Sequence, residues 1–202
     1  MVGVELSPHM LDVCRQKLQE EPAAVQSRVQ LVQADMRRFD LNRTFRLITI
    51  PFRPFQHLLS VDDQLACLER VHRHLDSSGR LIVDLFNPSL DFLVSRPVGQ
   101  ELDAEPEFTT PDGRRVVRKH KTVAHDRFAQ VSDFELVYYI THPDGREERV
   151  VQTFRLRHVF RFEMEHLLAR AGFAVEHLYA GFDKTPYGSI YPGELIFVAR
   201  KT

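Results

Sequence analysis

The residues VGVELSPHML (2–11) decide how this sequence begins to fold. A β-branched apolar run is followed by an acid, Glu5, and then by Ser7 and Pro8. The run favours a strand, while serine at an N-cap and proline in the first turn favour a helix. This stretch therefore predicts a strand that feeds directly into a helix, with an acidic side chain at the carboxyl end of the strand.

Two further strands are predicted nearby. RVQLVQADM (28–36) and FRLITI (45–50) are rich in β-branched and apolar residues, and the polar RRFDLNRT (37–44) between them is turn-like. No helix is expected between these two strands.

A second helix is expected after Ser60. Ser60 and Asp63 resemble a capping box, and apolar residues follow them at helical spacing until DSSG (76–79), which should end the helix before a strand in RLIVDLF (80–86). Strands that alternate with amphipathic helices indicate an α/β fold, with a Rossmann-like, mostly parallel sheet and helices on both faces.

The pattern changes after residue 98. TPDGRR (110–115) and HPDGRE (142–147) are turn sequences between β-rich runs, which indicates an antiparallel insertion. RFEMEHLLARAGF (161–173) then restores a helix, and two last strands follow, AVEHLYAGF (174–182) and GELIFVARK (193–201). We therefore divide the chain into a core in residues 1–98, an antiparallel β lid insertion in residues 99–159, and a helix with two strands that completes the core in residues 160–202.

Composition narrows the class of protein. The 202 residues carry a formal net charge of -1 and are 43% hydrophobic, which gives no overall attraction to nucleic acid or to a membrane. Cys14 and Cys67 both fall in helical patterns, so we expect neither a disulfide nor a metal site. No apolar stretch approaches the ~20 residues of a membrane span, and no signal-peptide pattern opens the chain. A cytoplasmic protein is expected.

The order of these motifs resembles that of the class I S-adenosylmethionine-dependent methyltransferases, in particular those that act on small molecules and carry a β-rich lid. VGVELSPHMLDVCRQKL (2–18) looks like the second strand and helix of the family, and VQLVQADMRRFDL (29–41) looks like its third-strand motif. Residues 45–88 look like the fourth strand, its helix and the fifth strand. LARAGF (168–173) and ELIFVARK (194–201) are similar to the closing segment. The resemblance implies S-adenosylmethionine as cofactor and a small-molecule methyl acceptor, with no nucleic acid or membrane partner.

The resemblance also implies a part that is missing. In the family's strand order, 3-2-1-4-5-7-6, a first strand with a glycine-rich loop lies between the strands that correspond to VGVE (2–5) and FRLITI (45–50). Unpaired backbone groups in a buried sheet cost roughly 1 to 3 kcal/mol each. Either the two flanking strands pair directly, another chain supplies a strand, or the natural protein begins upstream of Met1. We expect the last, a chain truncated at its N-terminus, and we expect strand exchange in a homodimer as the alternative.

The residues that end the first three strands are expected to bind the cofactor. By the resemblance, Glu5 accepts hydrogen bonds from the ribose hydroxyls and Asp35 accepts one from the adenine amino group. A dehydrogenase also places an acid at a position like that of Glu5, and Asp35 would serve equally well as a turn cap. The full expected set is Glu5, Leu6, Ser7, Asp35, Met36, Arg37, Ile50, Pro51, Phe52 and Arg53.

The methionine moiety and the acceptor should meet near Ile50 to Arg53, although a solvent-exposed arginine is the alternative for Arg53. Methyl transfer depends mainly on an in-line approach and on exclusion of water. If the acceptor must lose a proton, His57 in PFQHLL is the best-placed histidine and His158 in RLRHVF the second, with a structural role as the alternative for each.

Three other groups of polar residues allow both a functional and a structural interpretation. Tyr138, Tyr139, Arg155 and Arg157 lie on lid strands, where alternation sends only half of the side chains toward an acceptor. The basic run GRRVVRKHKTVAHDR (113–127) is interpreted as the solvated face of an antiparallel sheet and not as a nucleic-acid site. His72 and His74 lie two residues apart on a helix, which separates them too far for a shared metal.

Two functions of different class are therefore open. The preferred one is a methyltransferase that transfers the methyl group of S-adenosylmethionine to a small molecule. The alternative is a non-catalytic, methyltransferase-like remnant that serves in protein association. A dehydrogenase is a weaker third, because the reversed last strand and the lid suit it less well.

Overall fold

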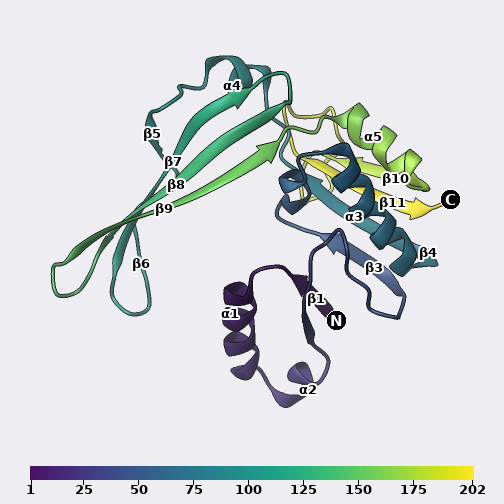
Figure 1. Cartoon of the computed structure of the whole chain (residues 1–202), viewed down its shortest axis with the longest axis horizontal. Coiled ribbons are helices and arrows are strands. Elements are labelled where there is room, and N and C mark those ends of the chain that lie inside the picture. Colours follow the sequence, from purple (N-terminus) through teal and green to yellow (C-terminus); the bar gives the residue numbers. More distant parts are fainter.

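The computed structural model describes residues 1–202, and its N-terminal part is a small α/β unit (Figure 1). Strands β1 (Val2–Glu5) and β2 (Gln30–Gln33) pair in parallel, and helices α1 (Pro8–Gln19) and α2 (Ala23–Gln26) connect them. The side-chain oxygen of Ser7 accepts a hydrogen bond from the backbone N–H of Met10 at 3.3 Å, so Ser7 caps α1 as its sequence predicts.

A four-stranded sheet forms the centre of the chain, in the order β10–β11–β4–β3. Strand β3 runs parallel to β4, while β11 runs antiparallel to both β4 and β10. The last strand is therefore the reversed one, and the predicted α/β fold is confirmed. The strands are β3 (Phe45–Ile50), β4 (Leu75–Leu85), β10 (Phe173–Tyr179) and β11 (Leu195–Lys201).

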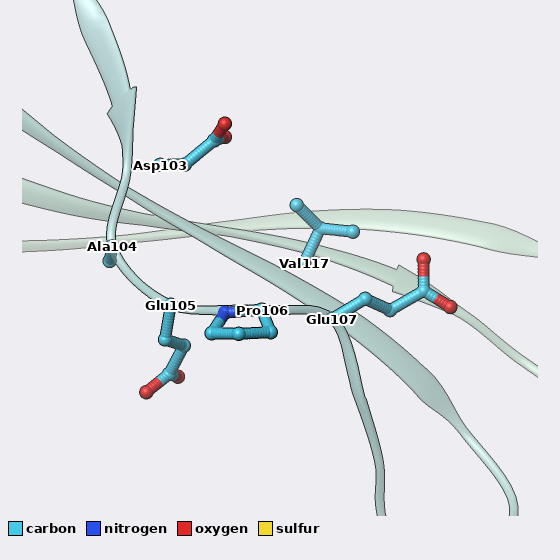
Figure 2. Close-up of a pocket in the computed structure, with 6 residues that line it drawn as sticks. All are labelled: Asp103, Ala104, Glu105, Pro106, Glu107 and Val117. Carbon is cyan, nitrogen blue, oxygen red and sulfur yellow. The ribbon is translucent and has the colours of Figure 1, made fainter.

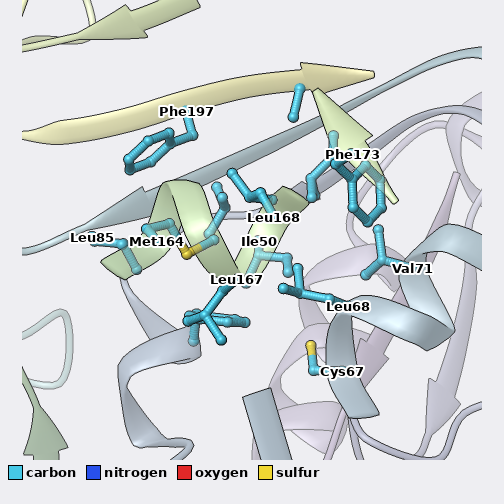
Figure 3. Packing of buried hydrophobic residues seen from close by; sticks show 14 of the residues in the cluster. Ile50, Cys67, Leu68, Val71, Leu85, Met164, Leu167, Leu168, Phe173 and Phe197 are labelled. Carbon is cyan, nitrogen blue, oxygen red and sulfur yellow. The ribbon is translucent and has the colours of Figure 1, made fainter. Parts of the chain in front are cut away.

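Helices α3 (Val61–His74) and α5 (Arg161–Arg170) enclose the main hydrophobic core with this sheet (Figure 3). The core is a cluster of 19 buried residues, to which one face of β4 and β11 contributes together with both helices. Ser60 accepts from the N–H of Asp63 at 3.1 Å and caps α3, and Gly172 follows α5 with a φ of +81°. Both helix boundaries follow from the local sequence.

The insertion is an antiparallel sheet that projects from this core (Figure 1). Its two turns are those predicted, with Gly113 and Gly145 at φ values of +82° and +85°. The short helix η1 (Pro54–His57) lies on the chain between β3 and α3, and α4 (Leu90–Ser95) lies between β4 and this sheet. The strands are β5 (Glu101–Asp103), β6 (Phe108–Thr109), β7 (Arg115–Asp126), β8 (Val131–Thr141) and β9 (Glu147–Arg157).

Strands β1 and β3 do not pair with each other. β1 pairs only with β2 and β3 pairs only with β4, so each of the two strands has one edge without a strand partner. This rules out the first of the three ways in which the expected gap could close, namely direct pairing of the flanking strands.

The segment DSSG (76–79) differs from its prediction. It does not separate a helix from a strand, because α3 ends at His74 and β4 already begins at Leu75. Leu75 pairs with Phe45, after which the register shifts so that Leu47 pairs with Arg80. The segment is thus an irregularity inside β4, which a local reading of turn residues does not anticipate.

Cys14 lies on α1 and Cys67 lies on α3. Cys14 and Cys67 are both free, and burial raises the pKa of the Cys67 thiol to about 12. None of the helices has the length and apolar character that crossing a membrane requires.

Gly79 should be essential to this irregularity. A Cβ at residue 79 would lie 2.8 Å from Cγ of Leu75 and 3.0 Å from the carbonyl oxygen of Phe45. We expect Gly79→Ala to lower the free energy of unfolding by about 1–3 kcal/mol through overpacking. Urea unfolding measures this, and the neighbouring exposed substitution Ser78→Ala serves as the control. Equal stability of the two variants would contradict the prediction.

Candidate active site

The ends of three neighbouring strands meet at one edge of the central sheet. Ile50 at the end of β3 pairs with Val83, and Leu195 at the start of β11 pairs with Leu85 at the end of β4. The residues that follow β3 and β4 and precede β11 therefore share this edge. In open α/β sheets, ligands bind at the carboxyl ends of the parallel strands.

The turn after β3 is strained and is supported by a buried acid. Phe52 and Arg53 have φ values of +66° and +65°, a conformation that costs non-glycine residues on the order of 1–2 kcal/mol each. The carboxylate of Asp84, which is 5% exposed, lies near the backbone N–H groups of Phe52 and Arg53. Burial raises the pKa of Asp84, while these N–H groups and the Arg53 charge oppose the rise.

Arg53 is not the free, solvent-exposed arginine that was the alternative to a ligand contact. Its Nη2 lies 2.5 Å from Oε1 of Glu194, which directly precedes β11, and its guanidinium lies 5.2 Å from the ring centre of Phe86. The second carboxylate oxygen of Glu194 is buried and has no hydrogen-bond partner. An ion pair thus joins the chain after β3 to the chain before β11, beside Phe86. Phe52 itself is 94% exposed.

Gln56 connects this edge to the insertion, and sequence reasoning missed it. Its side-chain oxygen accepts from the N–H of Phe86 at 2.7 Å, and its amide nitrogen donates to the carbonyl oxygens of Phe86 at 3.2 Å and Arg157 at 3.1 Å. The residue is 0% exposed. A glutamine beside the conspicuous His57 carries no sequence signal for such a role.

His57 faces the insertion. Its Nδ1 lies 3.0 Å from the carbonyl oxygen of Arg155 on β9, and its ring meets that of Phe154 edge-on at 6.0 Å. A carbonyl oxygen only accepts, so Nδ1 carries the proton in this contact and donates it. In the neutral ring Nε2 then carries the lone pair. The hydrogen bond to the insertion thus selects the tautomer whose Nε2 can accept a proton.

His158 lies in a different setting. It is 4% exposed, and its Nε2 is 2.7 Å from the hydroxyl oxygen of Ser132, which in turn lies 2.6 Å from Nδ1 of His125. Burial lowers the pKa of His158 to about 4. His158 is therefore neutral at physiological pH and is part of a buried chain of hydrogen bonds.

The two acids expected to bind the cofactor end the strands of the N-terminal unit. Oε1 of Glu5 accepts from the N–H of Ser7 at 2.8 Å. Asp35 accepts three side-chain hydrogen bonds from Arg37, whose guanidinium also reaches Asp63 at 2.8 Å, and these bonds lower the pKa of Asp35 to about 2. The loop after β2 is thus tied to the start of α3.

The N-terminal unit and the turn after β3 border the same core. The N–H of Ala34 donates to the carbonyl oxygen of Glu5 at 3.0 Å, which joins the ends of β1 and β2. Ala34 and Met36 pack against the cluster that includes Ile50. Of the other expected residues, Leu6 and Pro51 are exposed beside these strand ends.

The register of β8 against β9 places the four polar residues of the lid on two different faces of the sheet. Tyr139, Arg155 and Arg157 belong to one face of the β8–β9 pair, and Tyr138 belongs to the other. The face of Tyr138 also holds Phe134 and Phe154, whose rings stack at 5.5 Å, and through Phe154 this face meets His57.

The basic run on β7 is balanced by acids. Arg115, Arg118 and Lys119 pair with Glu107, Glu105 and Asp103, and these three acids line a hollow of about 400 Å³ on the insertion (Figure 2). None of the predicted site residues lines this hollow.

Comparison with known proteins adds to this geometry. Residues 1–79 match the family model of a methyltransferase domain. This match and the fold make the chain similar to class I S-adenosylmethionine-dependent methyltransferases. It is 27% identical over 180 residues to a dTDP-3-amino-3,6-dideoxy-alpha-D-glucopyranose N,N-dimethyltransferase of Streptomyces fradiae, a match that covers 89% of this chain and 63% of that protein.

Solved methyltransferases share the fold of nearly the whole chain. A S-adenosylmethionine-dependent methyltransferase from Clostridium acetobutylicum aligns with a TM-score of 0.79 at 15% identity, over 99% of this chain and 74% of the other. A sugar N-methyltransferase from a Streptoalloteichus species aligns with a TM-score of 0.69 at 25% identity, over 99% and 71%. This chain spans less than two thirds of the length of its curated relative from Streptomyces.

The buried His158 should make stability depend on pH. Folding lowers the pKa of His158 from 6.5 to about 4. Between these two pH values the unfolded chain binds a proton at His158 and the folded protein does not. The stability that neutral His158 contributes is complete above pH 6.5 and is lost as the pH falls toward 4, a change of at most about 3 kcal/mol.

We expect this loss to be smaller by about 1–3 kcal/mol in His158→Gln. Urea unfolding at pH 7, 5.5 and 4.5 measures it, with the exposed substitution His166→Gln as a control that keeps the wild-type slope. The assignment is wrong if His158→Gln and wild type lose the same stability over this range.

Proposed function

We propose that the protein is an enzyme that transfers the methyl group of S-adenosylmethionine to an amine on a small molecule. The observation that carries the proposal is His57, whose Nδ1 is committed to the Arg155 carbonyl so that Nε2 is left to accept a proton at the strand ends. The names of the relatives support the acceptor class, because two of them are N-methyltransferases of sugars. These observations favour an enzyme over a non-catalytic remnant.

The residues of the N-terminal unit fit the cofactor. Glu5 uses one carboxylate oxygen for Ser7, which orients the group and leaves Oε2 for a ribose hydroxyl. Leu6, which is 64% exposed, offers an apolar surface next to it. Asp35 and Met36 would border the adenine, with Asp35 held in place by Arg37. When bound, the cofactor supplies an electrophilic methyl group on a sulfonium sulfur.

The chain's own residues then have three tasks. The turn of Phe52 and Arg53, fixed by Asp84, orients the acceptor at the sheet edge. The insertion contacts this edge where its Phe154 ring meets His57, and an acceptor bound against both would be shielded from water. His57 Nε2 takes the proton that the acceptor nitrogen loses as its new bond to carbon forms.

Removal of the Glu5 charge should weaken cofactor binding. A hydrogen bond to a charged group contributes about 1.5–3 kcal/mol, so we expect Glu5→Gln to weaken the binding of S-adenosylhomocysteine by about tenfold or more. Calorimetric titration measures this in the protein that carries residues 1–202, with the exposed substitution Glu21→Gln as control. Equal affinities of the wild type and Glu5→Gln would show that Glu5 does not bind the cofactor.

Removal of the His57 ring should slow methyl transfer without affecting cofactor binding. We expect His57→Ala to lower kcat by roughly 10²- to 10³-fold, the range for loss of a general base, and to leave the affinity for S-adenosylhomocysteine within twofold. The assay uses dTDP-3-amino-3,6-dideoxy-alpha-D-glucopyranose as acceptor, and the exposed substitution His166→Ala is the matched control. An unchanged kcat would assign His57 a structural role.

A further inference from the structure

A bulge in β7 gathers polar side chains on one face of the insertion. The register of β7 against β8 shifts between Thr122 and Ala124, so that Thr122 pairs with Phe134 and His125 pairs with Ser132. Without the bulge, strand alternation would send Thr122 and His125 to opposite faces. The bulge places both on the same face, together with His120 two residues earlier.

Arg96 lies against this face. Its Nε donates to the hydroxyl oxygen of Thr122 at 3.2 Å, and its guanidinium lies 4.5 Å from the ring centre of Phe92. The N–H of Gly99 donates to the Thr122 carbonyl oxygen at 2.8 Å. The chain after α4 is thus fixed on β7, with a guanidinium beside a hydroxyl that is itself buried.

No acid neutralises this guanidinium. Burial alone lowers the pKa of Arg96, whereas neighbouring carboxylates would raise it. The carboxylate of Asp103 acts to raise the pKa of His120. Its side chain, however, is 79% exposed and forms an ion pair with Lys119 at 3.0 Å, and not with Arg96. Buried charges are normally paired, so a half-buried arginine without an acid leaves a position for an anion.

Three imidazole nitrogens of this part of the insertion and of the residue that follows β9 also have no partner. Nε2 of His120, Nε2 of His125 and Nδ1 of His158 are buried and make no hydrogen bond, although at least nine in ten buried polar groups have one. His125 and the almost fully buried His158 are held by the hydroxyl of Ser132, which is 1% exposed. The Ser132 hydroxyl donates to only one of these two rings, so when it donates to Nδ1 of His125 and accepts from Nε2 of His158, the free Nε2 of neutral His125 carries a hydrogen and can donate.

We propose that Arg96, His120 and His125 form a binding site for an oxyanion, a phosphate or carboxylate group that the methyl acceptor carries. The acceptor part of this assignment rests on the proposed function. The site lies on the sheet face that meets His57, because Thr122 pairs with Phe134, whose ring stacks on Phe154 next to His57. A ligand held by its anionic group at Arg96 would extend along this face toward the base.

The test is a titration that needs no methyl transfer. Imidazole NMR signals and calorimetry follow the binding of inorganic phosphate, acetate and dTDP to the wild type, Arg96→Gln, Arg96→Lys and Arg46→Gln. Arg46 is an exposed arginine on β3 that forms no ion pair and serves as the matched control. Titration with S-adenosylhomocysteine on the same samples reports separately on the proposed function and on folding of the variants.

We expect phosphate and dTDP to shift the signals of His120 and His125, and Arg96→Gln to weaken their binding by about tenfold or more. Arg96→Lys should lose less, and Arg46→Gln less than twofold. Tighter binding of dTDP than of phosphate supports an anion carried by a larger ligand, whereas equal binding overturns that part of the proposal. Unmoved histidine signals with all three probes, or wild-type affinity in Arg96→Gln, overturns the site.

Discussion

The side-chain amide of Gln56 is the contact on which the arrangement of this protein depends. With three hydrogen bonds it joins η1 to the end of β4 and to the last residue of β9. A buried amide without its partners costs roughly 1–3 kcal/mol per unsatisfied group, so the three segments must stay together for the amide to remain satisfied. The insertion is thereby held at the sheet edge, and His57, the next residue, is brought to the Arg155 carbonyl.

The turn after β3 shows a second constraint of the same kind. Two successive residues, Phe52 and Arg53, adopt left-handed conformations that neither prefers, and the buried carboxylate of Asp84 lies near their N–H groups. Strain of this sort persists only where the surroundings impose it, and it is concentrated at functional sites. The turn carries Arg53 to Glu194 and leaves the ring of Phe52 in solvent. The edge of the sheet is thus shaped before any ligand arrives.

The insertion uses its two faces differently, and the bulge in β7 decides which residues belong to each. One face carries paired charges such as Lys121 with Glu135, which contribute little beyond solubility at the surface. The other face carries aromatic rings and the chain of His125, Ser132 and His158, and it meets the core at His57. A single extra residue on the strand therefore determines which histidines lie near the site.

The sequence by itself determined the local structure: helices capped by Ser7 and Ser60, and turns at Gly113 and Gly145. These depend on residues a few positions apart, whose preferences act within one turn or one strand. It also placed Glu5, Asp35 and Arg53 at strand ends. Only the tertiary structure assigned Gln56, Asp84, Glu194 and Arg96 to their contacts, since Gln56 and Arg157 are 101 residues apart and Arg53 and Glu194 are 141 apart. Pairings over such separations depend on how whole elements pack, which no local pattern records.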